Sequence, residues 1–343
     1  MSIWDSNTVV RRKGGCSEVK RTGGFLPDPR LAAFVVVVLC GAGSAPAAWQ
    51  SVVPCSRWGE ATVVGALDEA YIDEASGLAT SGESGERLFL INDSGDLGRF
   101  YVTAADGSRT EVVAIEGFEP VDVEDIARGR CPGGDGSCLF IADIGDNAAR
   151  RAETEIVVVR EQSPFPASVQ PERRIRVRYP DGPRDAESVA FHPNGDLIIL
   201  TKTADYSTLR VAPSILYRLA YERWAQGGGD VQVAERIGEL ALAAVSSDAF
   251  SGSLPTAMDI SGDGGRFLVL TYLNAFEFYF DLSEPFSKPA AEMVEGVDYR
   301  EIPVPALQQQ ESIAYLPSGR GFLFTTEGGG PEGVPLMRVT CEE

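Results

Sequence analysis

Five acidic residues recur along the chain, each at the head of a short apolar segment. They are Glu74, Glu124, Glu187, Asp259 and Glu311. Two carboxylates about 5 Å apart repel by roughly 3 kcal/mol at an effective dielectric near 20. If these acids converge, they need a cation, a shared proton or a basic partner. Carboxylate oxygens without nitrogen or sulfur ligands suit Ca²⁺ better than Zn²⁺, so we predict a calcium site formed by these five residues.

A second polar set follows the next apolar segment of each repeat and is expected to surround the acids as a ligand-binding face. Its members are Asp93, Asp96, Asp143, Asp146, Asn147, Arg150, Lys202, Tyr272 and Glu327. Two of these loops share the spacing D-x-G-D, which also suits an ordinary tight turn. Neither loop has the acidic offsets of an EF-hand. Salt bridges from Arg99, Arg150, Arg151 and Lys202 are the alternative to a bound cation.

The segments that carry these residues form a repeat of short strands bounded by turn residues. In each repeat the acid opens a first strand, and a second strand follows at residues 87–91, 138–142, 196–201, 266–271 and 321–325. Third and fourth strands are expected at residues 99–103 and 111–115, 155–160 and 173–179, 214–221 and 231–240, and 275–280 and 299–304. Short helical turns are expected near residues 221–225 and 240–244. Four strands per repeat predict an all-β, five-bladed β-propeller.

The last repeat has only one further strand, at residues 335–340, and residues 61–67 at the other end of the chain can complete it. This closes the ring and covers two exposed strand edges. Cys55 and Cys341 would then lie at neighbouring strand ends, and their disulfide would add roughly 4–5 kcal/mol of stability. Cys131 and Cys138 are expected to close a hairpin loop. Six blades, a two-sheet sandwich and two small β domains are the alternatives.

The first 47 residues have the order of a secretory signal peptide: a basic leader, a short apolar run and small residues ending in Ala-Pro-Ala. We therefore expect a signal peptide over residues 1–47, a single propeller domain over residues 48–343, and a periplasmic or secreted protein. The apolar run is too short to span a membrane. Lipoprotein anchoring through Cys40 is the less favoured alternative, because Leu39 stands where a small residue is needed.

Removing that leader leaves 24 basic and 47 acidic residues. Such a surface repels phosphate backbones and anionic lipid, which excludes nucleic acid as a partner. An unknown small molecule or protein is the expected partner, and no membrane span is expected in the mature chain. Many exported proteins are acidic, so the excess of acidic residues does not by itself indicate a binding site.

Most catalytic classes lack their residues here. The only histidine, His192, is expected on the face opposite the acids, which disfavours a Ser-His-Asp triad. A zinc site is disfavoured because no C-x-x-C spacing occurs. Paired carboxylates for glycoside hydrolysis stay open. So does metal-dependent hydrolysis of a phosphate ester, with Lys202 or Arg150 holding the phosphate.

Motifs at residues 74–78, 92–96, 123–127, 142–147 and 185–189 resemble those of a family of exported bacterial β-propellers. More loosely, they are similar to the SdiA-regulated and phytase-like propellers, over roughly residues 61–340. The SdiA-regulated resemblance implies a metal in the central channel, held by the same five acids. Calcium-dependent apyrases are similar in placing a cation centrally, but this chain lacks a match to their nucleotide-binding residues. We therefore expect a calcium-binding module for a ligand or partner, with a phosphoesterase as the alternative.

Overall fold

The computed structural model describes residues 9–13, 16–20, 54–82, 85–227, 229–329 and 333–342. Chain contacts divide the protein into residues 1–50 and residues 51–343. In the first unit β1 (Val9–Lys13) pairs with β2 (Cys16–Lys20). The predicted signal peptide falls mostly outside the described residues, so it stays a prediction. No helix in the described ranges is long and apolar enough to cross a membrane.

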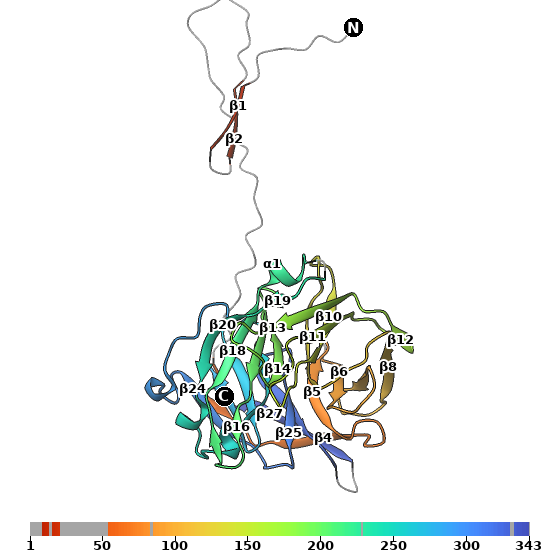
Figure 1. Cartoon of the computed structure of the whole chain (residues 1–343), viewed down its shortest axis with the longest axis vertical. Helices are drawn as coiled ribbons and strands as arrows, with labels where there is room; N and C mark the ends of the chain where they lie inside the picture. The colour runs from red at the N-terminus through yellow and green to blue at the C-terminus, as the bar shows by residue number, and fades with distance from the viewer. Residues whose placement is uncertain are drawn as a thin grey trace, which may run out of the picture. The chain divides into compact units, whose positions relative to one another are not determined.

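Residues 51–343 form a five-bladed β-propeller, as predicted (Figure 1). Blade 1 contains β5 (Ala75–Thr80), β6 (Arg87–Asn92), β7 (Arg99–Ala104) and β8 (Glu111–Ile115). Blade 2 contains β9 (Val123–Arg130), β10 (Ser137–Asp143), β11 (Thr154–Arg160) and β13 (Arg173–Arg178). Blade 3 contains β14 (Ala186–Phe191), β15 (Leu197–Thr201), β18 (Ser214–Leu219) and β20 (Glu235–Leu240). Blade 4 contains β21 (Pro255–Ile260), β22 (Phe267–Thr271), β23 (Asn274–Phe278) and β24 (Tyr299–Pro303).

Blade 5 is built from both ends of the domain, which closes the ring. Its strands β25 (Gln310–Tyr315), β26 (Gly321–Thr326) and β27 (Val334–Glu342) are completed by β4 (Thr62–Leu67), antiparallel to β27. A short strand, β3 (Arg57–Trp58), pairs with the far end of β27. The predicted closure is therefore confirmed, and Figure 1 shows the N-terminal strand β4 beside the C-terminal strand β27.

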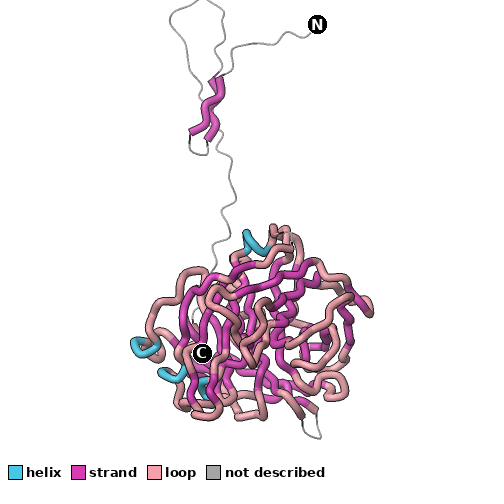
Figure 2. The backbone as a smooth tube through the Cα atoms, in the orientation of Figure 1, coloured by secondary structure: helices cyan, strands magenta, loops and turns pink. Residues whose placement is uncertain are grey.

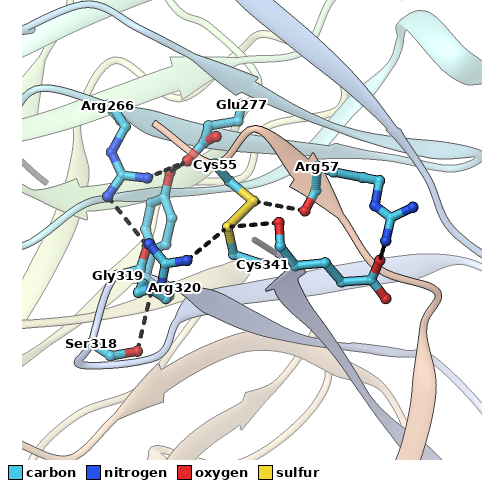
Figure 3. The surroundings of a disulfide bond; sticks show 10 residues. Cys55, Arg57, Arg266, Glu277, Ser318, Gly319, Arg320 and Cys341 are labelled. Carbon is cyan, nitrogen blue, oxygen red and sulfur yellow. Dashed lines mark hydrogen bonds and ion pairs between the residues drawn. A yellow bond between two sulfur atoms is a disulfide. The ribbon is translucent and has the colours of Figure 1, made fainter. Parts of the chain in front are cut away.

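Both predicted disulfides are present. Cys55 and Cys341 join the two ends of the ring across 286 positions of sequence. Cys131 and Cys138 close a hairpin loop. Beside the first disulfide, Figure 3 shows the ion pair of Arg266 with Glu277, whose atoms lie 2.7 Å apart in a buried position.

One predicted strand was wrong. Residues 231–240 were expected to form a single outer strand of blade 3, but they divide into β19 (Gln232–Val233) and β20. β19 pairs in parallel with β13 of blade 2. Just after β19, the N–H of Ala234 donates to the carbonyl of Arg178 at the end of β13. In the same way β12 (Ser168–Val169) extends blade 1. These additions cover the outer edges of two blades.

In the ranges that the structure describes, helical structure is limited to short pieces, and Figure 2 shows strands dominating the domain. They are α1 (Tyr221–Trp224), η1 (Leu242–Ala244), η2 (Ser251–Ser253) and η3 (Ala290–Glu292). A small hairpin of β16 (Ala204–Asp205) and β17 (Arg210–Val211) projects from the loop between β15 and β18. The core consists of five apolar clusters, each between two adjacent blades. Middle strands face two clusters at once, so they are apolar on both faces, as in Leu139, Phe140 and Ile141 of β10.

Candidate cation site at the acidic mouth

Each innermost strand has a β-bulge near its start, and the bulge sets which side chain faces the centre of the ring. The register skips one residue in every blade: Ser76, Glu124, Glu187, Thr256 and Glu311. A bulge leaves its extra residue unpaired and redirects that side chain. Three of the five equivalent positions are glutamates, and all three are buried. The predicted repeat of acids is therefore real in blades 2, 3 and 5.

Blades 1 and 4 differ from the prediction. Their bulge positions are hydroxyls, which bond to the next blade: Ser76 Oγ donates to the Glu124 carbonyl at 2.8 Å, and Thr256 Oγ1 to the Gln310 carbonyl at 2.8 Å. The predicted acid Glu74 lies two residues before the bulge and is exposed.

Asp259, the predicted acid of blade 4, lies three residues after the bulge rather than at the head of the strand. Its carboxylate accepts the N–H groups of Ile260 (2.8 Å) and Tyr315 (2.7 Å). It therefore joins blade 4 to blade 5 and is not part of the cluster described below. Burial raises the pKa of Asp259 to about 7.

Six carboxylates converge where the innermost strands begin, and we call them the acidic mouth. They are Asp93, Asp122, Glu124, Glu187, Glu311 and Glu327. In two groups of three, one oxygen from each residue lies within 4.8 Å of the others. One group is Asp93, Glu311 and Glu327, and the other is Asp93, Asp122 and Glu124. Both groups have the all-oxygen donor set that calcium prefers.

Glu124 is the least compensated member of the acidic mouth. It is 5% exposed, and within the described residues its carboxylate has no hydrogen-bond partner. Gly145 lies directly against it: a Cβ at this glycine would lie 2.1 Å from Glu124 Oε1 and 2.6 Å from Asp122 Oδ2. A side chain at position 145 would therefore fill the space that both carboxylates face.

Lys202 compensates the opposite side of the mouth. Its ammonium lies 2.7 Å from Glu187 Oε2 and 3.5 Å from the hydroxyl of Tyr272, which in turn donates to Glu311 Oε1 at 3.0 Å. Lys202 is only 8% exposed. The salt-bridge alternative thus holds for Glu187, while the two groups of three around Asp93 contain no basic side chain.

The pKa values of the mouth follow from burial and mutual repulsion. Burial first, and then Glu187, Asp93 and Asp122, hold the pKa of Glu124 well above its ordinary value. Burial raises the pKa of Glu187 to about 8, although Lys202 acts in the opposite direction.

The neighbouring groups follow the same pattern. Burial, then Glu327, raises the pKa of Glu311 to about 8. Burial also raises the pKa of Asp122 to about 6. For Lys202 burial lowers the pKa, but the nearby charges, with Glu187 the largest, reverse this and raise it.

Most of the predicted D-x-G-D residues hold loops rather than face the mouth. Asp96 pairs with Arg99 at 2.5 Å and accepts from the Tyr101 hydroxyl at 2.7 Å. Asp143 pairs with Arg151 at 2.7 Å and accepts two backbone N–H groups of the loop that enters β9.

The rest of the second D-x-G-D loop also lies apart from the two groups of three. Asp146 accepts from the backbone N–H of Arg151 at 2.6 Å. Asn147 and Arg150 are exposed. Of the first loop, Asp93 alone belongs to the mouth.

Two acids near the innermost strands were not predicted: Asp122, which belongs to the mouth, and Asp185, whose Oδ1 accepts the backbone N–H of Asp146 at 2.9 Å. Asp122 and Asp185 each lie two residues before a bulge glutamate, in the position that Glu74 occupies in blade 1. In four blades an alanine lies three residues after the bulge. Aligning the repeats on this alanine would have shown that three blades also have an acid two residues before the bulge.

No family model and no curated protein matches the chain. An aldose sugar dehydrogenase from Streptomyces coelicolor is similar at 11% identity and a TM-score of 0.49, covering 84% of this chain and all of that one. The hydrazine synthase of Kuenenia stuttgartiensis has 10% identity and a TM-score of 0.41, covering 78% and 72%. The WD40 repeats of RRP9 have 8% identity and a TM-score of 0.40, covering 78% and 79%. These identities and TM-scores are too low to define a class. The class therefore rests on the strand order and the acidic mouth, which make the protein a five-bladed β-propeller with a carboxylate-lined mouth.

Proposed function

We propose that this chain is an exported, calcium-binding β-propeller that uses its acidic mouth to bind a ligand or partner. One observation carries the proposal: six carboxylates converge there, and Lys202 is the one basic side chain paired with any of them in the described part of the chain. Burial first, and then repulsion from neighbouring carboxylates, raises the pKa of Glu124 and Glu311, and a hard divalent cation would offset that repulsion. Export is supported by two disulfides, which persist in oxidising compartments where calcium is also plentiful.

A calcium ion at the mouth would leave room for a ligand. Ca²⁺ takes six to eight oxygen ligands, and three carboxylates supply some of them. The remaining positions would be open to water or to oxygen atoms of a bound molecule. This gives the mouth a way to recognise anionic or polyhydroxylated ligands, although the protein surface itself is acidic.

Thermal melting with calcium and with EDTA tests the proposal. Calcium is expected to raise the melting temperature of wild type, because an ion that binds only the folded protein stabilises it by mass action. The variant Glu124→Gln should show a much smaller shift, and Glu222→Gln, an exposed acid on α1, should respond as wild type does. No difference between calcium and EDTA for wild type would refute the proposal.

The phosphoesterase alternative has a narrower basis. Lys202 is the cation best placed to hold a phosphate at the mouth, but its ammonium is already engaged by Glu187. Hydrolysis of a phosphate ester by wild type, lost in Glu124→Gln, would favour the enzyme. Turnover that is unaffected by this substitution would remove the mouth as a catalytic site.

A further inference from the structure

We infer that the acidic mouth holds two cations rather than one, and that the Asp93 carboxylate is shared between them. This inference rests on the proposed calcium site and specifies its stoichiometry. The two groups of three carboxylates have no member in common except Asp93. Glu311 and Glu327 come from blade 5, whereas Asp122 and Glu124 come from blade 2.

The fold holds Asp93 between those two blades. Asp93 follows β6 of blade 1, and its N–H donates to the Glu74 carbonyl at 2.9 Å. Glu74 in turn forms an isolated bridge with Glu327 of blade 5. The N–H of Ser94 donates to Asp93 Oδ1 at 2.5 Å, which orients the carboxylate. A carboxylate has about four lone-pair positions, so it can serve two ions while keeping this bond.

Charge also favours two ions. The two groups contain five carboxylates, because Asp93 is counted once, and neither contains a basic residue. With all five carboxylates ionised, one Ca²⁺ would leave three negative charges among them, and two would leave one. Lys202 does not reduce this surplus, because Glu187, which belongs to neither group, offsets it.

A separate observation points to an ion in the blade 2 group. Glu124 is 5% exposed and lacks a hydrogen-bond partner within the described residues. It faces the space beside Gly145, and Asp122 faces the same space, since a Cβ at Gly145 would lie within 2.6 Å of both carboxylates. A buried carboxylate without a partner is costly unless a charge compensates it. The blade 5 group, whose Glu311 is partnered by Tyr272, is a second and different environment.

Equilibrium dialysis of the purified full chain against calcium tests the inference. We expect two calcium ions per chain for wild type. Glu124→Gln and Glu327→Gln should each retain one ion, because each removes a ligand from a different group. Asp93→Asn should weaken both sites by about tenfold or more, since it removes a ligand from each. Asp205→Asn, an exposed acid on the β16 strand, is the control and should retain two ions.

The outcomes separate the two proposals. One ion per wild-type chain would overturn the two-ion inference and leave the calcium site standing, while no bound ion would overturn both. Loss of only one ion in Asp93→Asn would overturn the sharing. If circular dichroism shows that Asp93→Asn does not fold, a second experiment replaces it: luminescence energy transfer between Tb³⁺ and Eu³⁺ bound together to wild type. Ions that share a carboxylate lie about 4 Å apart and transfer excitation efficiently, and absence of transfer would overturn the inference.

Discussion

Replacing Glu124 with glutamine should stabilise the calcium-free protein, although it removes a buried charged group. At 4.8 Å, the limit that encloses the ligand oxygens of its group, each neighbouring carboxylate repels Glu124 by about 3 kcal/mol at an effective dielectric near 20. Proton uptake by Glu124 relieves part of this repulsion. We therefore expect Glu124→Gln to gain about 1–3 kcal/mol in EDTA at about pH 8.5.

The sign of the pH dependence follows from the raised pKa. Between the ordinary value of 4.5 and its higher folded value, Glu124 is protonated more in the folded protein than in the unfolded chain. Its contribution to stability is present below pH 4.5 and is lost as the pH rises through the folded pKa. The gain from Glu124→Gln should therefore be close to zero at about pH 4.5 and grow towards high pH.

Urea unfolding in EDTA at both pH values measures this gain, with the exposed Glu222→Gln as the matched control. Calcium should reverse the order at high pH, because wild type then gains binding energy that the variant lacks. A variant less stable than wild type in EDTA at high pH would refute the reasoning. It would mean that the Glu124 carboxylate is already compensated within the folded protein.

Three further predictions concern the ring and the mouth. Replacing Cys55 and Cys341 with serine should lower the free energy of unfolding by up to about 5 kcal/mol, because the disulfide closes a loop across 286 positions. Asp259→Asn should cost about 1–3 kcal/mol in urea unfolding, because the two N–H groups donate to different carboxylate oxygens and the amide NH₂ group would face one of these donors. Calcium affinity should fall below about pH 8, because Glu311, with a pKa of about 8, must lose a proton to bind the ion. Calorimetry in buffers of different ionisation enthalpy should detect that proton.

Each of these predictions has a direct control. Removing the Cys131–Cys138 disulfide, whose loop spans 7 positions, should cost only about 2 kcal/mol in the same model. Equal losses for the two disulfides would contradict the ring-closing role of the first. Asp230→Asn, at an exposed side chain, should leave stability within about 0.5 kcal/mol. Calcium affinity that does not change with pH would contradict the raised pKa of Glu311.

The sequence predicted the propeller because strand signals are local and recur. The closing strand at residues 61–67 and the pairing of Cys55 with Cys341 followed from the incomplete last repeat. The division of residues 231–240 was missed because β19 pairs with another blade, which no local pattern reveals.

The site was predicted in part. Glu124, Glu187 and Glu311 were placed together correctly, since they follow one spacing relative to the apolar strand. Glu74 and Asp259 were misaligned because an acid near a strand was taken as equivalent to the bulge residue. Glu74 lies before β5 begins, and Asp259 lies three positions beyond the bulge, where its carboxylate accepts the N–H of Tyr315. Whether Lys202 neutralises the mouth depends on distances that only the folded chain shows.

Direct calcium binding to the acidic mouth is the most decisive measurement. Isothermal titration of the metal-free full chain with CaCl₂ should give saturable binding for wild type. A variant with both Glu124 and Glu311 replaced by glutamine should give none under the same conditions, provided that circular dichroism shows it folded. Wild type without calcium binding, or a double variant that binds as wild type does, would contradict the proposal that these carboxylates form a cation site.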